Sequence, residues 1–307
     1  MTVMISFQDA EPHLDWLALT DALVDGHSYP EAGVADTFLY QGTDTLLNRS
    51  AWIAGMGIAV KCATIFPGNT ALQKPTIGGA VTLFSPTDGS LEAILDFHLV
   101  TKWKTAGDSL LAARRLARPE SERILIVGAG TVGHSLFDAY RTAFPRAHFE
   151  IWNRSSVGAE RFVSTYPDVR IAPNLADAVH AADIVTCATM ATEPVIKGEW
   201  LRPGQHIDLI GAYRPDMREA DDAVLSAGRL FVDSRKSTIE HIGELRLPIA
   251  AGVITPDSVL ADYYQLDQFT RHSDDEITVF KNGGGAHLDL MTSRYILAAW
   301  QRANNAS

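Results

Sequence analysis

Three glycines near the middle of the chain, Gly128, Gly130 and Gly133, have the spacing that binds the pyrophosphate of a dinucleotide. An apolar run of strand type directly precedes them and a helical pattern follows, which is the context that this motif requires. Gly128 permits a tight turn, Gly130 lets the backbone approach the phosphates, and Gly133 lets the helix pack on the strand. Thr131 and Val132, at the start of that helix, belong to the same predicted anion site.

The residues after the next predicted strand, Asn153, Arg154 and Ser155, bear on which nicotinamide dinucleotide is bound. An enzyme for NAD places an acid there, which accepts hydrogen bonds from the ribose and repels a 2′-phosphate. Asn153 occupies that position, and its two neighbours can pair with a phosphate or donate to it. The sequence therefore favours NADP(H), although a loop arginine is also an ordinary solvated charge.

Two lysines could move a proton or bind an anion. Lys61 interrupts an apolar run, Gly57–Phe66, where it is either a solvent-exposed residue of an alternating strand or a group facing a substrate cleft. Lys104 lies in a predicted helix and by itself is compatible with a helix surface. The sequence contains no zinc-protease, P-loop or serine-hydrolase motif.

The first third of the chain predicts an antiparallel sheet that is flanked by helices. Apolar spacing predicts a helix over 8–26, and short β-rich runs follow between 37 and 96. The turn Ser85–Gly89 predicts a hairpin, and a second helix is expected over 99–116.

Alternating strand and helix patterns between about 123 and 283 predict βαβ units and a parallel, doubly wound sheet. A last helix over 286–302 has no place in that alternation, so we expect it to return to the first domain.

Composition excludes several classes of protein. The chain has 307 residues, with 26 Lys and Arg against 37 Asp and Glu, and its net charge of −11 disfavours a nucleic-acid surface. Its two cysteines are far apart and lack metal or disulfide spacing. No basic leader and no long apolar run is present, so we expect a cytoplasmic protein with neither a membrane nor a nucleic acid as partner.

The chain resembles the ornithine cyclodeaminase/mu-crystallin family over nearly its whole length, because an ordered series of its motifs matches. The matches are the Lys61 strand ending Phe66-Pro-Gly-Asn69, the hairpin Leu83–Gly89 into Ala93–Asp96, Thr101 with Thr105-Ala106, the glycine fingerprint with Trp152-Asn-Arg154, Ala188-Thr189 with Glu193-Pro194, Gly211–Glu219, Val232–Ser234, and Thr278–Lys281 with Gly284, Ala286 and Asp289.

The resemblance implies an α/β protein with two domains and a homodimer that joins the N-terminal sheets. A Rossmann NADP-binding domain over 120–283 would be inserted into a discontinuous α+β dimerisation and substrate domain, 1–119 and 284–307. Family members reduce or form C=N bonds with NAD(P), or bind ligands without turnover.

Carried over position by position, the resemblance implies a role for each matching residue. Lys61 would hold or protonate the substrate, and Glu240 would lie near the ligand pocket. The residues implied to bind the cofactor are Thr105, the fingerprint Gly128–Gly133, Asn153, Arg154, Ser155, Ala188, Thr189, Met190 and Asn282, the last where a serine is usual.

Three positions depart from the family pattern. Lys104 replaces the arginine that grips the substrate carboxylate, so a planar bidentate pair is lost. The segment 34–39 lacks the second carboxylate-binding arginine, and Tyr213 replaces the catalytic aspartate of cyclodeaminases, as either an acid or a pocket wall. Ornithine cyclisation is therefore disfavoured.

We expect an NADPH-dependent imine or ketimine reductase, an oxidoreductase that transfers hydride to the C=N bond of a small imine, or of a carbonyl and amine pair. Lys61, Lys104, Tyr213 and Glu240 are its predicted substrate-contacting residues. An amino-acid dehydrogenase, an N-alkyl amino acid synthase and a non-enzymatic NADPH-binding protein remain alternatives.

Overall fold

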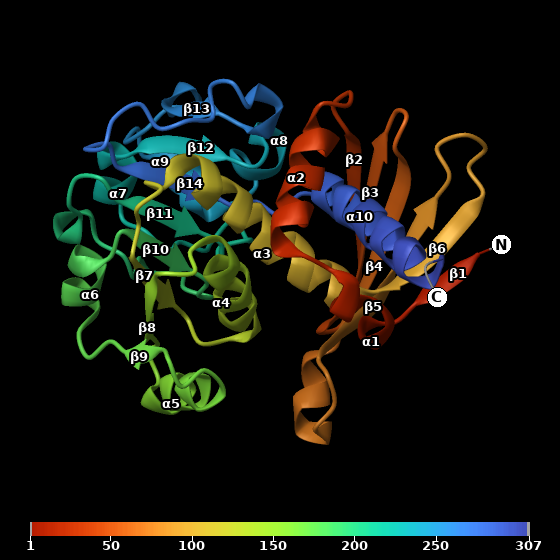
Figure 1. Ribbon diagram of the computed structural model, residues 1–307, viewed down its shortest axis with the longest axis horizontal. Coiled ribbons are helices and arrows are strands. Elements are labelled where there is room, and N and C mark those ends of the chain that lie inside the picture. The colour runs from red at the N-terminus through yellow and green to blue at the C-terminus, as the bar shows by residue number, and fades with distance from the viewer. Residues whose placement is uncertain (1, 306–307) are drawn as a thin grey trace. The chain divides into compact units, whose positions relative to one another are not determined.

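The computed structural model describes residues 2–305 and divides into two compact units (Figure 1). Unit 1 combines the chain up to Lys104 with the segment from Gly285 onward, and unit 2 runs from Thr105 to Gly284. Unit 1 is therefore discontinuous in sequence.

The elements of unit 1 are strands of one sheet, helices, and two short 3-10 turns. They are β1 (Val3–Ile5), α1 (Phe7–Ala10), η1 (Glu11–His13), α2 (Trp16–His27), β2 (Gly33–Gln41), β3 (Asp44–Ile53), β4 (Gly57–Ile65), η2 (Pro67–Leu72), β5 (Ile77–Phe84), β6 (Leu91–Asp96), the start of α3 (Phe97–Leu116), and α10 (Ala286–Asn305).

The sheet of unit 1 has the strand order β1-β6-β5-β4-β3-β2. The neighbours from β2 to β6 pair antiparallel, as the sequence predicts, and β1 adds to β6 in parallel. The predicted hairpin joins β5 to β6, with Gly89 at a φ of 70° at its turn. The sheet register follows from alternation, since each inward residue pairs with an inward residue of the next strand.

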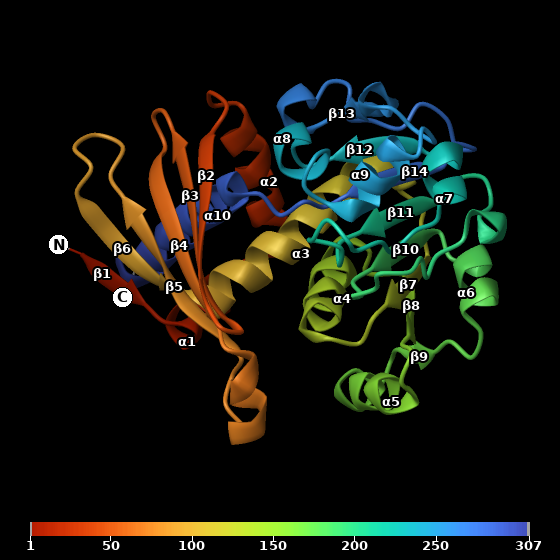
Figure 2. The same ribbon diagram turned by 180° about the vertical axis from the view of Figure 1, so that it is seen from behind.

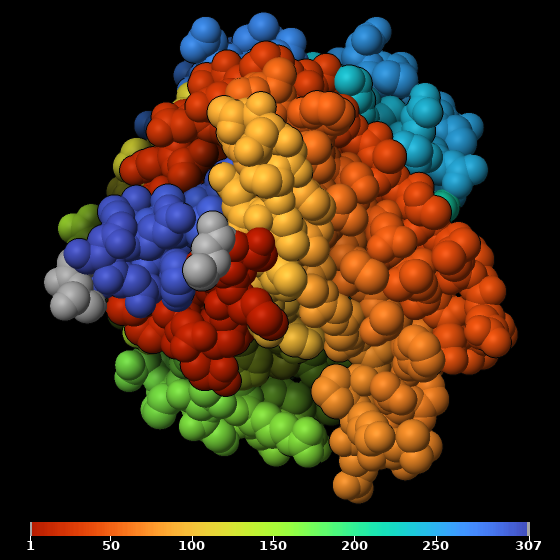
Figure 3. Space-filling view, turned by 90° about the vertical axis from the view of Figure 1, so that its right-hand side faces the viewer, coloured from red at the N-terminus to blue at the C-terminus, as the bar shows by residue number. Residues whose placement is uncertain are grey.

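Helix α10 covers one face of this sheet, and the other face is turned to the viewer in Figure 2. The buried residues between helix and sheet include Ile53, Leu83 and Ile296, which are inaccessible to solvent. Figure 3 shows strands of unit 1 as a continuous orange-to-yellow surface beside the blue α10. The C-terminal helix therefore returns to unit 1, as predicted.

The single helix predicted over 8–26 is wrong, because the chain breaks it into α1, η1 and α2. Pro12 stands in the 3-10 turn, where its ring and missing N–H prevent a continuous helix. Asp15 then caps α2 by accepting a hydrogen bond from the backbone N–H of Ala18 at 2.8 Å.

Unit 2 alternates strands and helices along the chain. Its elements are the rest of α3, β7 (Arg123–Val127), α4 (Thr131–Ala143), β8 (His148–Trp152), α5 (Ser156–Thr165), β9 (Arg170–Ile171), α6 (Leu175–Ala181), β10 (Ile184–Cys187), η3 (Gly198–Trp200), β11 (His206–Leu209), α7 (Asp222–Ala227), β12 (Arg229–Val232), α8 (Arg235–Thr238), α9 (Gly243–Ala250), η4 (Pro256–Ser258), β13 (Val259–Ala261), η5 (Tyr263–Gln265) and β14 (Thr278–Lys281).

The sheet of unit 2 is parallel, in the order β13-β12-β14-β11-β10-β7-β8-β9. The strand order reverses direction at β7, between β8 and β10, which is where doubly wound sheets bind ligands. Its strands are buried apolar runs such as Ile124–Val127, typical of a sheet covered on both faces. The predicted Rossmann fold class is thereby confirmed.

The division between the units falls within α3, earlier than the predicted boundary at 119/120. The second half of α3 belongs to unit 2 and forms hydrogen bonds with its other elements. The Ser109 hydroxyl donates to Asp208 at 3.1 Å, and the Tyr263 hydroxyl donates to the Asp108 carbonyl at 2.7 Å. A helix that packs on the parallel sheet belongs with that sheet, although its sequence pattern gives no sign of the change.

Candidate functional site

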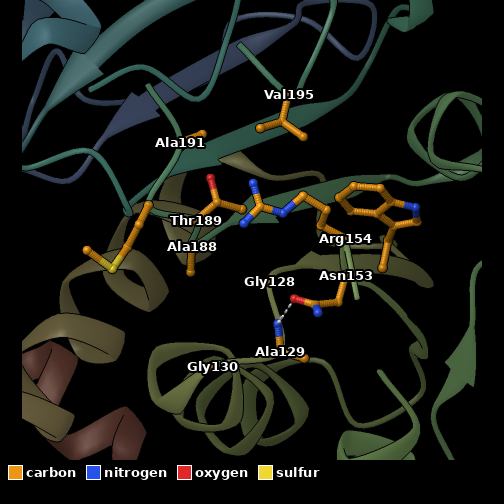
Figure 4. Close-up of a pocket in the computed structure, with 11 residues that line it drawn as sticks. Gly128, Ala129, Gly130, Asn153, Arg154, Ala188, Thr189, Ala191 and Val195 are labelled. Carbon is orange, nitrogen blue, oxygen red and sulfur yellow. Dashed lines mark hydrogen bonds between the residues drawn. The ribbon is translucent and has the colours of Figure 1, made fainter. Parts of the chain in front are cut away.

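A pocket of about 240 Å³ opens in unit 2 at the carboxyl ends of β7, β8 and β10 (Figure 4). Its position at the reversal of strand order is that of a nucleotide site. It is lined by Gly128, Ala129, Gly130, Trp152, Asn153, Arg154, Ala188, Thr189, Met190, Ala191 and Val195.

The glycines of the fingerprint are required by close approaches of the backbone. Gly128 has a φ of 111°, and a Cβ there would lie 2.6 Å from the Ala188 carbonyl. A Cβ on Gly133 would collide with the Gly128 carbonyl. Gly130 is the N-cap of α4, and no described side chain caps this end, so the first-turn N–H groups of Thr131 and Val132 suit a pyrophosphate.

Of the three residues after β8, Asn153 and Arg154 line the pocket, and Asn153 also holds the glycine-rich loop. The Ala129 N–H donates to Asn153 Oδ1 at 3.0 Å, as the dashed line in Figure 4 marks, and Asn153 Nδ2 donates to the Ser155 carbonyl at 2.9 Å. Figure 4 shows the Arg154 side chain extending into the pocket, and Ser155 is the exposed N-cap of α5. A neutral amide beside an exposed guanidinium is suited to a phosphate.

The segment after β10 forms the opposite wall, with Ala188, Thr189 and the exposed Met190. Thr189 is fixed by the buried Glu219, which accepts hydrogen bonds from its N–H at 2.6 Å and its hydroxyl at 2.9 Å. Glu219 could not be assigned this role from the sequence, because no spacing rule connects it with a residue 30 positions earlier.

The remaining predicted residues of unit 2 lie outside the lining of this pocket. Asn282 is buried and donates from Nδ2 to the Thr105 carbonyl at 3.1 Å and to Ser109 Oγ at 3.0 Å. Tyr213 is 58% exposed and lies against the Arg214 guanidinium, and Glu240 is exposed after α8. Exposure of Tyr213 favours neither a packed wall nor an acid activated by burial.

Unit 1 contains a separate cluster of buried charges, centred on Lys61 of β4 and Asp289 of α10. Lys61 Nζ and Asp289 Oδ1 form an ion pair of 2.7 Å, and both side chains are less than a tenth exposed. Burial lowers the pKa of Lys61 to about 8, with Asp289 opposing and Lys104 adding to the shift. Burial alone would raise the pKa of Asp289, but the positive charges of Lys61, Lys104 and Arg49 hold it below its usual value.

Arg49 is a residue of this cluster that the sequence analysis missed. It lies on β3 directly opposite Lys61 on β4 and opposite Asp36 on β2. Its Nη2 forms an ion pair of 3.1 Å with Asp36, and its charge acts on Lys61 and Asp289. The alternation of side chains along β3 is the sequence signal that could have identified Arg49, since it places Arg49 on the same face as the inward Ala51 and Ile53.

The cluster as a whole can bind an anion and move a proton. Lys104 is 6% exposed, so its ammonium is not on a helix surface. Burial also lowers the pKa of His287 to about 3, with Lys104 adding to the shift, so this imidazole is neutral. Three cations against Asp289 leave positive charge for a ligand carboxylate, even with Asp36 beside Arg49.

Residues 2–305 contain neither a metal-ligand cluster nor a membrane-spanning helix. Within that range, no group of three His, Cys, Asp or Glu side chains could hold a metal ion. No helix in the same range combines the length and the apolarity needed to cross a membrane. Both cysteines, Cys62 and Cys187, are free thiols.

Comparison with known proteins gives concordant matches. The model of the "Ornithine cyclodeaminase/mu-crystallin family" matches residues 51–304. A "Delta(1)-pyrroline-2-carboxylate reductase" of Paracoccus denitrificans (strain Pd 1222) is 50% identical over 95% of both chains. The "Ketimine reductase mu-crystallin" of Mus musculus is 34% identical over 79% of this chain and 76% of its own.

A solved structure extends the likeness to the whole fold. An archaeal alanine dehydrogenase dimer with bound NAD is 25% identical, with a TM-score of 0.89 over 99% of this chain and 97% of its own. The sequence matches and the shared fold agree, and the chain is a member of the ornithine cyclodeaminase/mu-crystallin family.

Proposed function

We propose that the protein is an NADPH-dependent reductase of cyclic imines that carry a carboxylate beside the C=N bond, of the pyrroline-2-carboxylate type. The observation that carries this proposal is 50% identity, over 95% of both chains, to the Paracoccus pyrroline-2-carboxylate reductase. The buried cations of unit 1 support it, because they suit a substrate that contains both an anion and a basic nitrogen.

The residues divide the chemical tasks between the two units. Reduction needs a hydride at the imine carbon, which a reduced nicotinamide supplies when bound, and a proton at the nitrogen. Gly128–Gly133, Asn153, Arg154 and Thr189 would hold the dinucleotide in unit 2. In unit 1 the Lys61 ammonium, oriented by Asp289, would protonate the imine nitrogen directly or through water, and Arg49 with Lys104 would bind the carboxylate.

The test is turnover of matched cyclic imines, one with a 2-carboxylate and one without it, each with NADPH and with NADH. The loss of reduced-nicotinamide absorbance measures the rate. Turnover mainly of the carboxylated imine supports the proposal. Preference for the imine without the carboxylate refutes this substrate class, and NADPH binding without any turnover favours a ligand-binding protein instead.

The preference for NADPH rests on the neutral Asn153 beside Arg154. Asn153→Asp keeps the acceptor for the Ala129 N–H but places a negative charge where the 2′-phosphate would bind. Charges this close repel by several kcal/mol at protein surfaces, so we expect the kcat/KM ratio of NADPH to NADH to fall at least about ten-fold. Arg154→Gln is the matched variant and should weaken NADPH only. An unchanged ratio in both variants would contradict the preference.

We also propose a cytoplasmic homodimer. The NAD-bound relative is itself described as a dimer, and the β2 edge of unit 1 exposes Phe38, Leu39 and Tyr40, an apolar edge that soluble monomers rarely leave uncovered. Two free thiols are compatible with a reducing compartment.

A further inference from the structure

Glu219 is a fully buried carboxylate that lies between two turns of unit 2. It accepts three hydrogen bonds, from the Thr189 N–H at 2.6 Å, from the Thr189 hydroxyl at 2.9 Å, and from the Gly211 N–H at 2.6 Å. Thr189 follows β10 and Gly211 follows β11, so one side chain connects the ends of two neighbouring strands. Thr189 is the member of this group that lines the nucleotide pocket.

The position of Glu219 is itself fixed by a second buried carboxylate. Glu244, near the start of α9, accepts the N–H groups of Glu219 at 2.7 Å and Ala220 at 3.0 Å. The Glu219 carbonyl accepts from the N–H groups of Val195 and Ile196, at 2.8 and 2.9 Å. These four hydrogen bonds hold the backbone around Glu219 in place. They therefore fix the point from which its carboxylate reaches Thr189 and Gly211.

The contact between Gly211, Thr189 and Glu219 leaves no room for a side chain at position 211. A Cβ on Gly211 would overlap the Thr189 backbone and lie 2.6 Å from Glu219 Oε1. Only glycine therefore lets the turn after β11 approach Thr189 closely enough to share the carboxylate. Gly128 also approaches the preceding residue closely, since a Cβ there would lie 2.6 Å from the Ala188 carbonyl oxygen, so the contact continues to the glycine-rich loop.

Glu219 accepts these bonds as an anion. Burial raises the pKa of Glu219, while the charge of the buried Lys281 and the donors of Thr189 act in the opposite direction. The backbone N–H of Thr189 donates to Oε1 and that of Gly211 donates to Oε2, so each oxygen of Glu219 faces a group that can only donate, which favours the carboxylate form. The Lys281 ammonium, which donates to the Leu209 carbonyl at 2.9 Å, supplies the compensating charge.

We infer that Glu219 is a positioning residue that sets the hydrogen-bonding polarity of Thr189 toward the cofactor. Both donors of Thr189, its N–H and its hydroxyl, are used on Glu219. With its hydroxyl hydrogen on Glu219, the Thr189 oxygen offers only lone pairs to its other neighbours, which are Cys187 Sγ at 3.9 Å and a ligand in the pocket, and it selects a ligand group with a hydrogen to donate. Resting on the proposed function, this assigns Thr189 to a ribose hydroxyl or the carboxamide nitrogen of the nicotinamide half.

Binding measurements on Glu219→Gln test the assignment, because a glutamine must turn its NH₂ toward at least one donor. We expect the Kd for NADPH, measured by nucleotide fluorescence, to rise at least about ten-fold. Thr189→Val removes the lone pairs and should raise it about five- to ten-fold, whereas Thr189→Ser keeps the hydroxyl and should stay within about two-fold.

The fragment 2′,5′-ADP separates positioning from general damage, since it lacks the nicotinamide half. Both Glu219→Gln and Thr189→Val should bind this fragment as the wild type does. Equal losses for NADPH and the fragment would overturn the inference, and so would additive effects in the double variant. If Glu219→Gln does not fold, Thr189→Val and Thr189→Ser decide by the same comparison. A wild-type protein that binds no NADPH would refute the proposed function itself.

Discussion

Lys61→Met is expected to lower kcat/KM for the carboxylated imine about a thousand-fold, within the range of a lost general acid. The Lys61 ammonium is buried, paired with Asp289 at 2.7 Å, and is the group assigned to protonate the nitrogen. Binding of NADPH should change less than about two-fold, because Lys61 is assigned to the imine and not to the dinucleotide. Steady-state rates and fluorescence titration measure the two quantities.

The dependence of the wild-type kcat/KM on pH tests the same role of Lys61 without a substitution. Burial lowers the pKa of Lys61 to about 8, so the ammonium is present below that pH and is lost as the pH rises through it. The wild-type kcat/KM should therefore fall above about pH 8, and Lys61→Met should lack this decline. Lys102→Met, which removes a partly buried lysine of α3 that pairs with Glu11 at 2.7 Å, is the matched control and should keep both rate and profile. A Lys61→Met enzyme with more than about a tenth of wild-type activity would refute the acid role.

Arg49→Gln is expected to lower kcat/KM for the carboxylated imine roughly 10- to 100-fold, the cost of one charge-assisted hydrogen bond. The rate for the imine without a carboxylate should be nearly unchanged, since Arg49 is assigned to the anion alone. The ratio of the two kcat/KM values is therefore the measurement. It is independent of the amount of folded enzyme.

Asp36→Asn is the matched control for Arg49. It removes the carboxylate 3.1 Å from the guanidinium but leaves the cation in place, so selectivity for the carboxylated imine should be kept or increased. Equal losses on both imines in Arg49→Gln would show that Arg49 stabilises the sheet and does not bind the substrate carboxylate. Reduced selectivity in Asp36→Asn would mean that the ion pair itself is required.

The nucleotide motif could be predicted from sequence because all of its parts are local. A strand, a glycine-rich turn and a helix follow one another within residues 123–143, and the backbone geometry of Gly128 is a property of that turn. The strand after Asp275 shows the limit of such patterns: β14 is inserted between β11 and β12, which no local signal indicates.

Arg49 and Glu219 were missed because their roles depend on long-range pairing. Arg49 reaches Lys61 only through the register of β3 on β4, and a slip of one residue would turn it to the other face. The family pattern implies an arginine in 34–39, but that strand, β2, supplies Asp36, and its neighbour β3 supplies the cation Arg49. Glu219 likewise gains its partners only when two parallel strands end side by side.

The return of α10 to unit 1 also bears on the order of events during synthesis. Lys61 and Asp289 are 228 positions apart, and the whole of unit 2 is translated between them. The whole of unit 2 is therefore synthesised before Asp289. Until Asp289 has been added, Lys61, which is buried in the finished protein, lacks its counter-ion. Closing so long a loop costs little more entropy than closing a short one, but the ion pair on which the proposed proton transfer depends forms only after unit 2 has been made.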